Sequence, residues 1–107
     1  MRQKPNLVFI MPDQLRADFL SCYGAGFIDT PHIDGLALQG LRYERAYSPS
    51  PLCVPARCTL LTGRNAVANG VLTNERFLRP DLAGGGIHTW PELLAGAGYA
   101  TAAIGKM

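Results

Sequence analysis

Two short apolar runs near the ends of this 107-residue chain are its clearest hydrophobic pattern. Residues 7–11 read Leu-Val-Phe-Ile-Met, and an unbroken apolar run is typical of a strand covered on both faces in a parallel sheet. Residues 99–104 are small and apolar, and we expect a second strand of the same sheet there. Ligands bind at the carboxyl ends of such strands. Asp13 and Gln14 follow the first run, and Lys106 follows the second.

Two helices are predicted from the residues at their first turns. Thr30 and Pro31 are typical of an N-cap followed by a first helical residue, and apolar residues at helical spacing continue to Gly40. Thr89 and Glu92 have the Thr-x-x-Glu spacing of a capping box. We therefore expect one helix after each of these signals.

The arrangement of these elements predicts the fold class. Residues 65–88 show no clear hydrophobic period, and we expect residues 84–86, three glycines, to form a flexible loop. Strands alternating with helices indicate an α/β protein with a mostly parallel sheet flanked by helices. Two parallel strands alone leave edges unpaired and faces uncovered. We therefore expect residues 1–107 to be one partial domain, the N-terminal part of an incomplete sheet.

The segment 53–64, Cys-Val-Pro-Ala-Arg-Cys-Thr-Leu-Leu-Thr-Gly-Arg, carries the most informative chemistry. Pro55 fits a first helical turn, where its missing N–H is not needed, and Gly63 fits the left-handed residue that ends a helix. Cys53 then lies at or beside the N-cap, where free N–H groups and the helix dipole favour an anion. Arg57 lies one turn later and leans back toward the helix start. This pattern predicts a nucleophile beside a pocket for a tetrahedral oxyanion.

Composition and charge exclude several classes of protein. The chain is 48% hydrophobic and 17% charged, as ordinary globular proteins are. A net charge of +2 without a basic run argues against nucleic acid as a partner. Three cysteines, an odd number, argue against a secreted disulfide framework. The apolar run at residues 7–11 is too short for a signal peptide or a membrane span, so we expect a cytoplasmic protein without a membrane partner.

The segment 53–64 resembles the active-site sequence of the type I sulfatases, Cys-x-Pro-Ser-Arg followed by Leu-Thr-Gly, with Ala56 in place of the serine. The resemblance extends along nearly the whole chain. Residues 6–14 are similar to the first strand of the family, residues 69–74 to its His-Gly-Val…Asn stretch, and residues 98–106 to the strand that ends in a substrate-binding lysine. It implies an alkaline-phosphatase-like α/β fold and hydrolysis of a sulfate monoester.

The resemblance also implies roles for particular residues. Cys53 would be oxidised to Cα-formylglycine by a formylglycine-generating enzyme, and the hydrated aldehyde would attack sulfur. Arg57 would stabilise this diol, and Lys106 would bind a sulfate oxygen. Asp13, Gln14 and the modified Cys53 would bind a divalent metal, expected to be Ca²⁺, with Mn²⁺ or Mg²⁺ as alternatives.

Two departures from the family leave alternatives open. Sulfatases typically have Asp-Asp where this chain has Asp13 and Gln14, a pair similar to that of choline-sulfatases and phosphonate monoester hydrolases. The substrate is therefore expected to be a small sulfated ester, with a phosphate or phosphonate ester as the alternative. The family's other metal ligands and its catalytic histidine lie beyond the segments matched here. A non-catalytic truncated fragment is the competing interpretation, and we expect the chain alone to be inactive.

Overall fold

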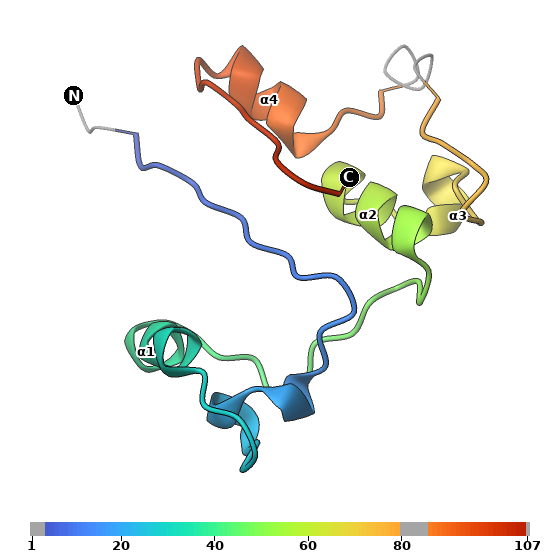
Figure 1. The fold of residues 1–107 in the computed structure, drawn as a ribbon. Helices are drawn as coiled ribbons and strands as arrows, with labels where there is room; N and C mark the ends of the chain where they lie inside the picture. Colours follow the sequence, from blue (N-terminus) through green and yellow to red (C-terminus); the bar gives the residue numbers. More distant parts are fainter. Residues whose placement is uncertain (1–3, 80–85, 107) are drawn as a thin grey trace. The chain divides into compact units, whose positions relative to one another are not determined.

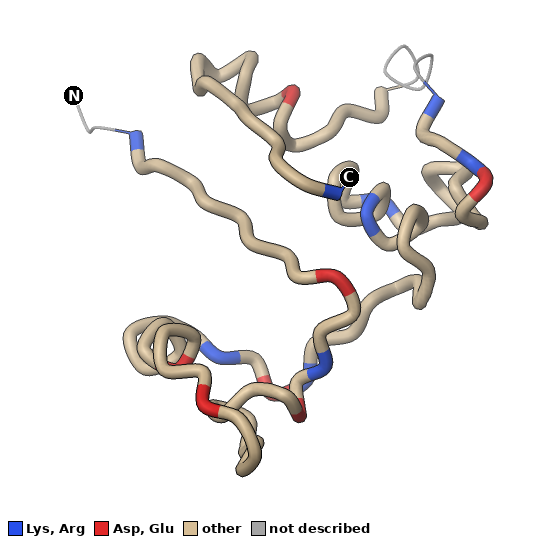
Figure 2. The backbone as a smooth tube through the Cα atoms, viewed as in Figure 1, with Lys and Arg blue, Asp and Glu red and all other residues tan. Residues whose placement is uncertain are grey.

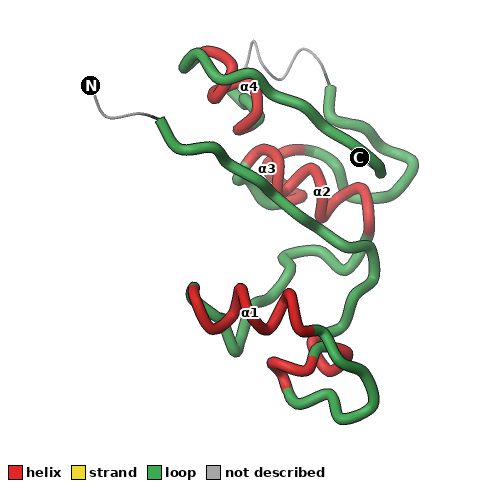
Figure 3. The backbone as a smooth tube through the Cα atoms, turned by 60° about the vertical axis from the view of Figure 1, so that its left-hand side comes forward, coloured by secondary structure: helices red, strands yellow, loops and turns green. Residues whose placement is uncertain are grey.

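The computed structural model describes residues 4–79 and 86–106, which fall into two compact units (Figure 1). The first unit is Met1–Arg45 and the second is Ala46–Met107. Helices and loops account for all described residues, with no strand among them (Figure 3).

The first unit contains two single-turn 3₁₀ helices, η1 (Ala17–Phe19) and η2 (Ser21–Tyr23), and the helix α1 (Pro31–Gln39). The helix α1 begins with proline and ends before Gly40, as predicted. The hydroxyl of Thr30 does not cap it, because this oxygen is engaged by Ser21 instead, at 2.7 Å.

A cluster of polar side chains joins η2 to the start of α1. Ser21 Oγ donates to Asp34 Oδ2 at 2.6 Å, and the Cys22 N–H donates to Asp34 Oδ1 at 2.8 Å. The hydrogen bond from Ser21, with further ones from Thr30 and Cys22, holds the pKa of Asp34 below its usual value despite partial desolvation. The cluster therefore fixes the loop before α1 to the helix itself.

The second unit contains the helices α2 (Cys53–Thr62), α3 (Ala66–Asn69) and α4 (Trp90–Gly96), and α2 packs against both others. The predicted capping box of α4 is present: the Glu92 N–H donates to Thr89 Oγ1, and the Thr89 N–H donates to Glu92 Oε2. The short helix α3 was not predicted. It is capped by Asn65, whose side chain accepts from the Ala68 N–H at 2.8 Å.

The two predicted strands are not confirmed. Residues 7–11 and 99–104 run as extended chain without the hydrogen-bond ladder of a sheet (Figure 1). Most of their side chains are exposed, Val8 to 83% and Ile104 to 97% of its surface, while Tyr99 is half-buried. A strand is stable only when neighbours satisfy its backbone groups and cover its faces, and a purely apolar run lacks a solvent face. Among the described residues, neither run pairs with another strand.

Two further features bear on the sequence expectations: membrane-spanning helices and the glycine loop. None of the helices in residues 4–79 and 86–106 is long and apolar enough to cross a bilayer. The predicted glycine loop at residues 84–86 falls mostly outside the described residues. Gly86, which is described, takes a positive φ of 82°.

Candidate active site

Cys53 is the first residue of α2 and is exposed. Pro55 occupies the first turn and left-handed Gly63 (φ 64°) ends the helix, as the sequence predicted. The N-cap is extended Leu52, so Cys53 lies beside the N-cap. The exposed position leaves the Cys53 side chain accessible to a modifying enzyme or a substrate.

Arg57 connects this helix to the end of the described chain. Its side chain is only 8% exposed, and Nη1 donates to the backbone carbonyl of Lys106 at 2.6 Å. Gly105 has a φ of 99° and turns the chain just before this contact. The structure therefore brings together two predicted site residues that lie 49 positions apart. The link between the guanidinium and the Lys106 main chain was not predicted.

Asn74 makes a second long-range contact with α2. Its Oδ1 accepts from the Val54 N–H at 3.1 Å, 20 residues away in sequence. The sequence resemblance included Asn74 but gave it no role. No local pattern predicts this bond, because the residues between the partners form other elements.

Asp13 and Gln14 lie in the first unit and are both exposed. Gln14 has a φ of 56° and is the one non-glycine residue with positive φ within residues 4–79 and 86–106. Carboxylate and amide oxygens suit a hard divalent cation, but Ca²⁺ takes about six to eight ligands. No group of three His, Cys, Asp or Glu side chains gathers in the described part of the chain. These residues thus fit a metal site by chemistry, as part of a larger ligand set.

The other two cysteines differ from Cys53 in environment. Cys58 is 8% exposed in the middle of α2, and burial raises the pKa of its thiol. Cys22, in η2, is partly exposed, and all three cysteines are free thiols. A buried thiol with a raised pKa is a poor nucleophile.

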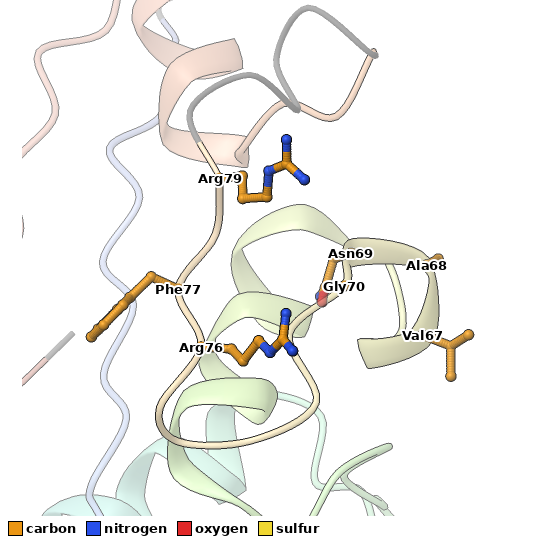
Figure 4. Close-up of a pocket in the computed structure, with 7 residues that line it drawn as sticks. All are labelled: Val67, Ala68, Asn69, Gly70, Arg76, Phe77 and Arg79. Atoms are coloured by element: carbon orange, nitrogen blue, oxygen red, sulfur yellow. The ribbon is translucent and has the colours of Figure 1, made fainter.

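A cavity of about 320 Å³ lies beside α3 in the second unit (Figure 4). Its polar lining includes Asn69, Arg76 and Arg79, and its apolar lining includes Val67 and Phe77. None of the predicted site residues lines this cavity. The cavity and the segment 53–64 therefore point to different locations for a functional site. Figure 2 shows Lys and Arg on several segments of the described backbone. Arg57 is the basic residue within α2 itself. The motif carries the reactive side chain, and we place the candidate site there.

Comparison with known proteins decides the family. The family model named Sulfatase matches residues 5–107. The chain belongs to the sulfatase family. It is 38% identical over 104 residues to an N-acetylglucosamine-6-O-sulfatase of Bacteroides thetaiotaomicron, covering 97% of this chain and 18% of that protein. It is 41% identical over 108 residues to a steryl-sulfatase of Rattus norvegicus, covering 95% of this chain and 19% of that protein.

A third relative of this sulfatase chain is an N-acetylgalactosamine-6-sulfatase of Canis lupus familiaris, 38% identical over 112 residues. That match covers 97% of this chain and 22% of the relative, so the chain spans about a fifth of the length of such proteins. No solved structure shows a significant match. Membership of the sulfatase family implies the alkaline-phosphatase-like α/β fold that the sequence resemblance predicted.

Proposed function

We propose that residues 1–107 are the N-terminal part of a sulfatase domain that hydrolyses sulfate monoesters through a formylglycine made from Cys53. One observation carries the proposal. Cys53 is exposed at the first residue of α2, while Arg57, one turn along, is buried and bonded to the main chain of Lys106. The three residues of the proposed sulfate site thus come from one helix and the segment attached to it.

The chemistry of the proposed reaction requires two hydroxyl groups on one carbon. A formylglycine-generating enzyme, using molecular oxygen as the oxidant, would oxidise the Cβ of Cys53 to an aldehyde while the sulfur leaves as hydrogen sulfide, and water would hydrate the aldehyde to a geminal diol. One diol oxygen attacks sulfur, the bond from sulfur to the ester oxygen breaks, and the alcohol leaves with a proton. The second hydroxyl then loses its proton, the aldehyde re-forms, and the carbon–oxygen bond to sulfate breaks.

Two cationic side chains serve this reaction in the proposal. Arg57 stabilises the diol and fixes the Lys106 segment through its bond to the Lys106 carbonyl. The ammonium of Lys106 binds a sulfate oxygen and stabilises the charge that develops there.

Asp13 and Gln14 are the proposed metal ligands of this chain, with Ca²⁺ as the expected ion. When bound, the metal would polarise the sulfate oxygens. The positive φ of Gln14 supports a functional role. Such backbone strain costs on the order of 1–3 kcal/mol and is concentrated at binding and catalytic sites. The remaining ligands would come from a later part of the domain, so the chain alone would be inactive.

The relatives' names support a sulfate ester as the substrate without selecting its alcohol. They name amino-sugar and steryl sulfates. Gln14 in place of a second aspartate removes one negative charge from the metal site and is the reason to keep phosphate and phosphonate esters as the alternative. The assay therefore includes an aryl sulfate and an aryl phosphate.

The test uses the complete enzyme that the proposal implies, with residues 1–107 as its N-terminal part. Cys53→Ala should abolish turnover of both esters while the protein stays folded. Cys53→Ser should give a single slow turnover at best, because a serine sulfate has no second hydroxyl to expel sulfate. Cys58→Ala is the matched control: it removes the buried thiol of the same helix and should retain activity with lower stability. Full activity of Cys53→Ala would overturn the assignment.

A further inference from the structure

The first turn of α2 lacks a cap from its own sequence. The N-cap residue is Leu52, which has no side-chain acceptor, and Pro55 has no N–H. The first intrahelical bond is that of the Ala56 N–H to the Leu52 carbonyl, at 2.9 Å. The N–H groups of Cys53 and Val54 precede it and have no partner within the helix. Asn74 supplies the acceptor for Val54 that the local sequence does not.

The segment that carries Asn74 is itself firmly held. Val71 and Asn69 are each only 1% exposed. The Val71 N–H donates to Asn69 Oδ1 at 2.9 Å, and Asn69 Nδ2 donates to the Arg64 carbonyl at 3.1 Å. The turn is closed by the Arg76 N–H, which donates to the Thr73 carbonyl at 3.3 Å. Asn74 is therefore presented to α2 from an anchored loop.

Holding the Val54 N–H also restrains residue 53. The peptide unit between Cys53 and Val54 is planar, so the direction of its N–H fixes the orientation of the Cys53 carbonyl and the position of the Cys53 Cα. Because Cys53 is the first residue of α2 and therefore has helical backbone dihedrals, the direction of its Cα–Cβ bond is then set as well. A misplacement of about 1 Å at a reacting group costs up to about 100-fold in rate.

We propose that Asn74 is a positioning residue for the nucleophile made from Cys53, acting through its hydrogen bond to the Val54 N–H. This inference rests on the function proposed above. It assigns Asn74 no contact with substrate. A residue that only caps the helix would affect stability alone. A positioning residue differs from it because loss of the Asn74 oxygen should also lower kcat, by more than the loss of folded protein accounts for.

Asn65 provides a matched control, because its side chain caps α3 in the same unit and also accepts a backbone N–H. In the complete enzyme, Asn74→Ala and Asn65→Ala should lower the melting temperature by similar amounts. Asn74→Ala should lower kcat by about 10- to 100-fold with little change in KM, and Asn65→Ala should leave kcat within about twofold. Rates are normalised to the formylglycine content measured by mass spectrometry.

Asn74→Asp keeps the acceptor and should recover most of kcat, while its added charge raises KM for an anionic ester. Equal kcat values for Asn74→Ala and Asn65→Ala would overturn the inference, since capping alone would then explain the bond. An Asn74→Asp variant as slow as Asn74→Ala would also overturn it, because the acceptor would not be what matters. A wild-type enzyme that carries formylglycine but hydrolyses no sulfate ester would instead overturn the proposed function.

Discussion

Two cysteines of α2 show how position within one helix sets the accessibility of a side chain. Cys53 is exposed at the first residue, where the helix N-terminus favours a negative charge. Cys58 lies five residues later, is buried, and has a raised thiol pKa because of that burial. The same side chain is thus accessible at one position and protected at the other.

The first prediction follows from this difference. Co-expression with a formylglycine-generating enzyme should lighten the tryptic peptide of residues 46–57 by about 18 Da, the change from thiol to aldehyde. Cleavage after Arg57 places Cys58 in a separate peptide, residues 58–64, whose mass should not change. Cys22 should likewise remain a thiol. An unchanged 46–57 peptide in the presence of active enzyme would contradict the proposed mechanism.

Arg57 is the second residue whose environment makes a prediction. Arg57→Ala removes a charged donor from the Lys106 carbonyl and should lower the free energy of unfolding by about 2 kcal/mol. It should also lower kcat, because the Lys106 segment loses its attachment to α2. Exposed Arg64, just beyond the helix, is the control, and Arg64→Ala should change neither quantity appreciably. Denaturant unfolding of the complete enzyme measures the free energy of unfolding, and aryl sulfate kinetics measure kcat.

At the scale of elements, the helices were predicted where the signal was local. Proline at a first turn, glycine at a helix end and the Thr89–Glu92 spacing each act within four residues, and all three were confirmed. The four-residue helix α3 was missed because its apolar residues span little more than one turn. Asn65, an N-cap residue by type, was the one sequence signal that indicates it.

The capping box of α4 makes stability depend on pH. Hydrogen bonds from the Thr89 backbone and then from its side chain hold the pKa of Glu92 below its usual value of 4.5. The folded state therefore prefers the carboxylate. This contribution to stability is fully present above the unfolded pKa and is lost as pH falls through the lower folded pKa.

Two variants separate the parts of the box. Glu92→Gln should flatten the fall in melting temperature of the complete enzyme between neutral pH and about pH 3. Thr89→Ala should lower stability by about 1 kcal/mol but keep most of the pH dependence, because the backbone N–H at position 89 still donates to Glu92. A pH profile unchanged in Glu92→Gln would show that other carboxylates dominate the acid transition.

At the scale of the whole molecule, the sequence predicted which segments are apolar but not what they pack against. The strands predicted at residues 7–11 and 99–104 need neighbours to form a sheet, and a strand's own sequence does not identify them. The bonds of Arg57 to Lys106 and of Asn74 to Val54 likewise join distant positions. Such contacts depend on how the elements assemble, which local residue patterns do not encode.

The uncovered apolar side chains predict the behaviour of the isolated chain. Leu38 and Val8 are exposed to 87% and 83%, and Ile104 to 97%. Soluble monomers rarely expose contiguous apolar patches of more than a few hundred Å². The 107-residue chain alone should aggregate or bind a hydrophobic dye, and the complete enzyme should not. A sharp cooperative melt of a clean 107-residue monomer would show that the fold needs nothing further.

The bond from Arg57 ends on a peptide carbonyl, a group that every amino acid carries. Any substitution at position 106 therefore leaves an acceptor for the guanidinium in the same place. The anchorage of the segment and the chemistry of the side chain that it presents can then vary independently during evolution. Under the proposed role of Lys106 in binding sulfate, a lineage in which lysine changes to arginine or histidine at this position would keep its scaffold while it acquires a different anion specificity.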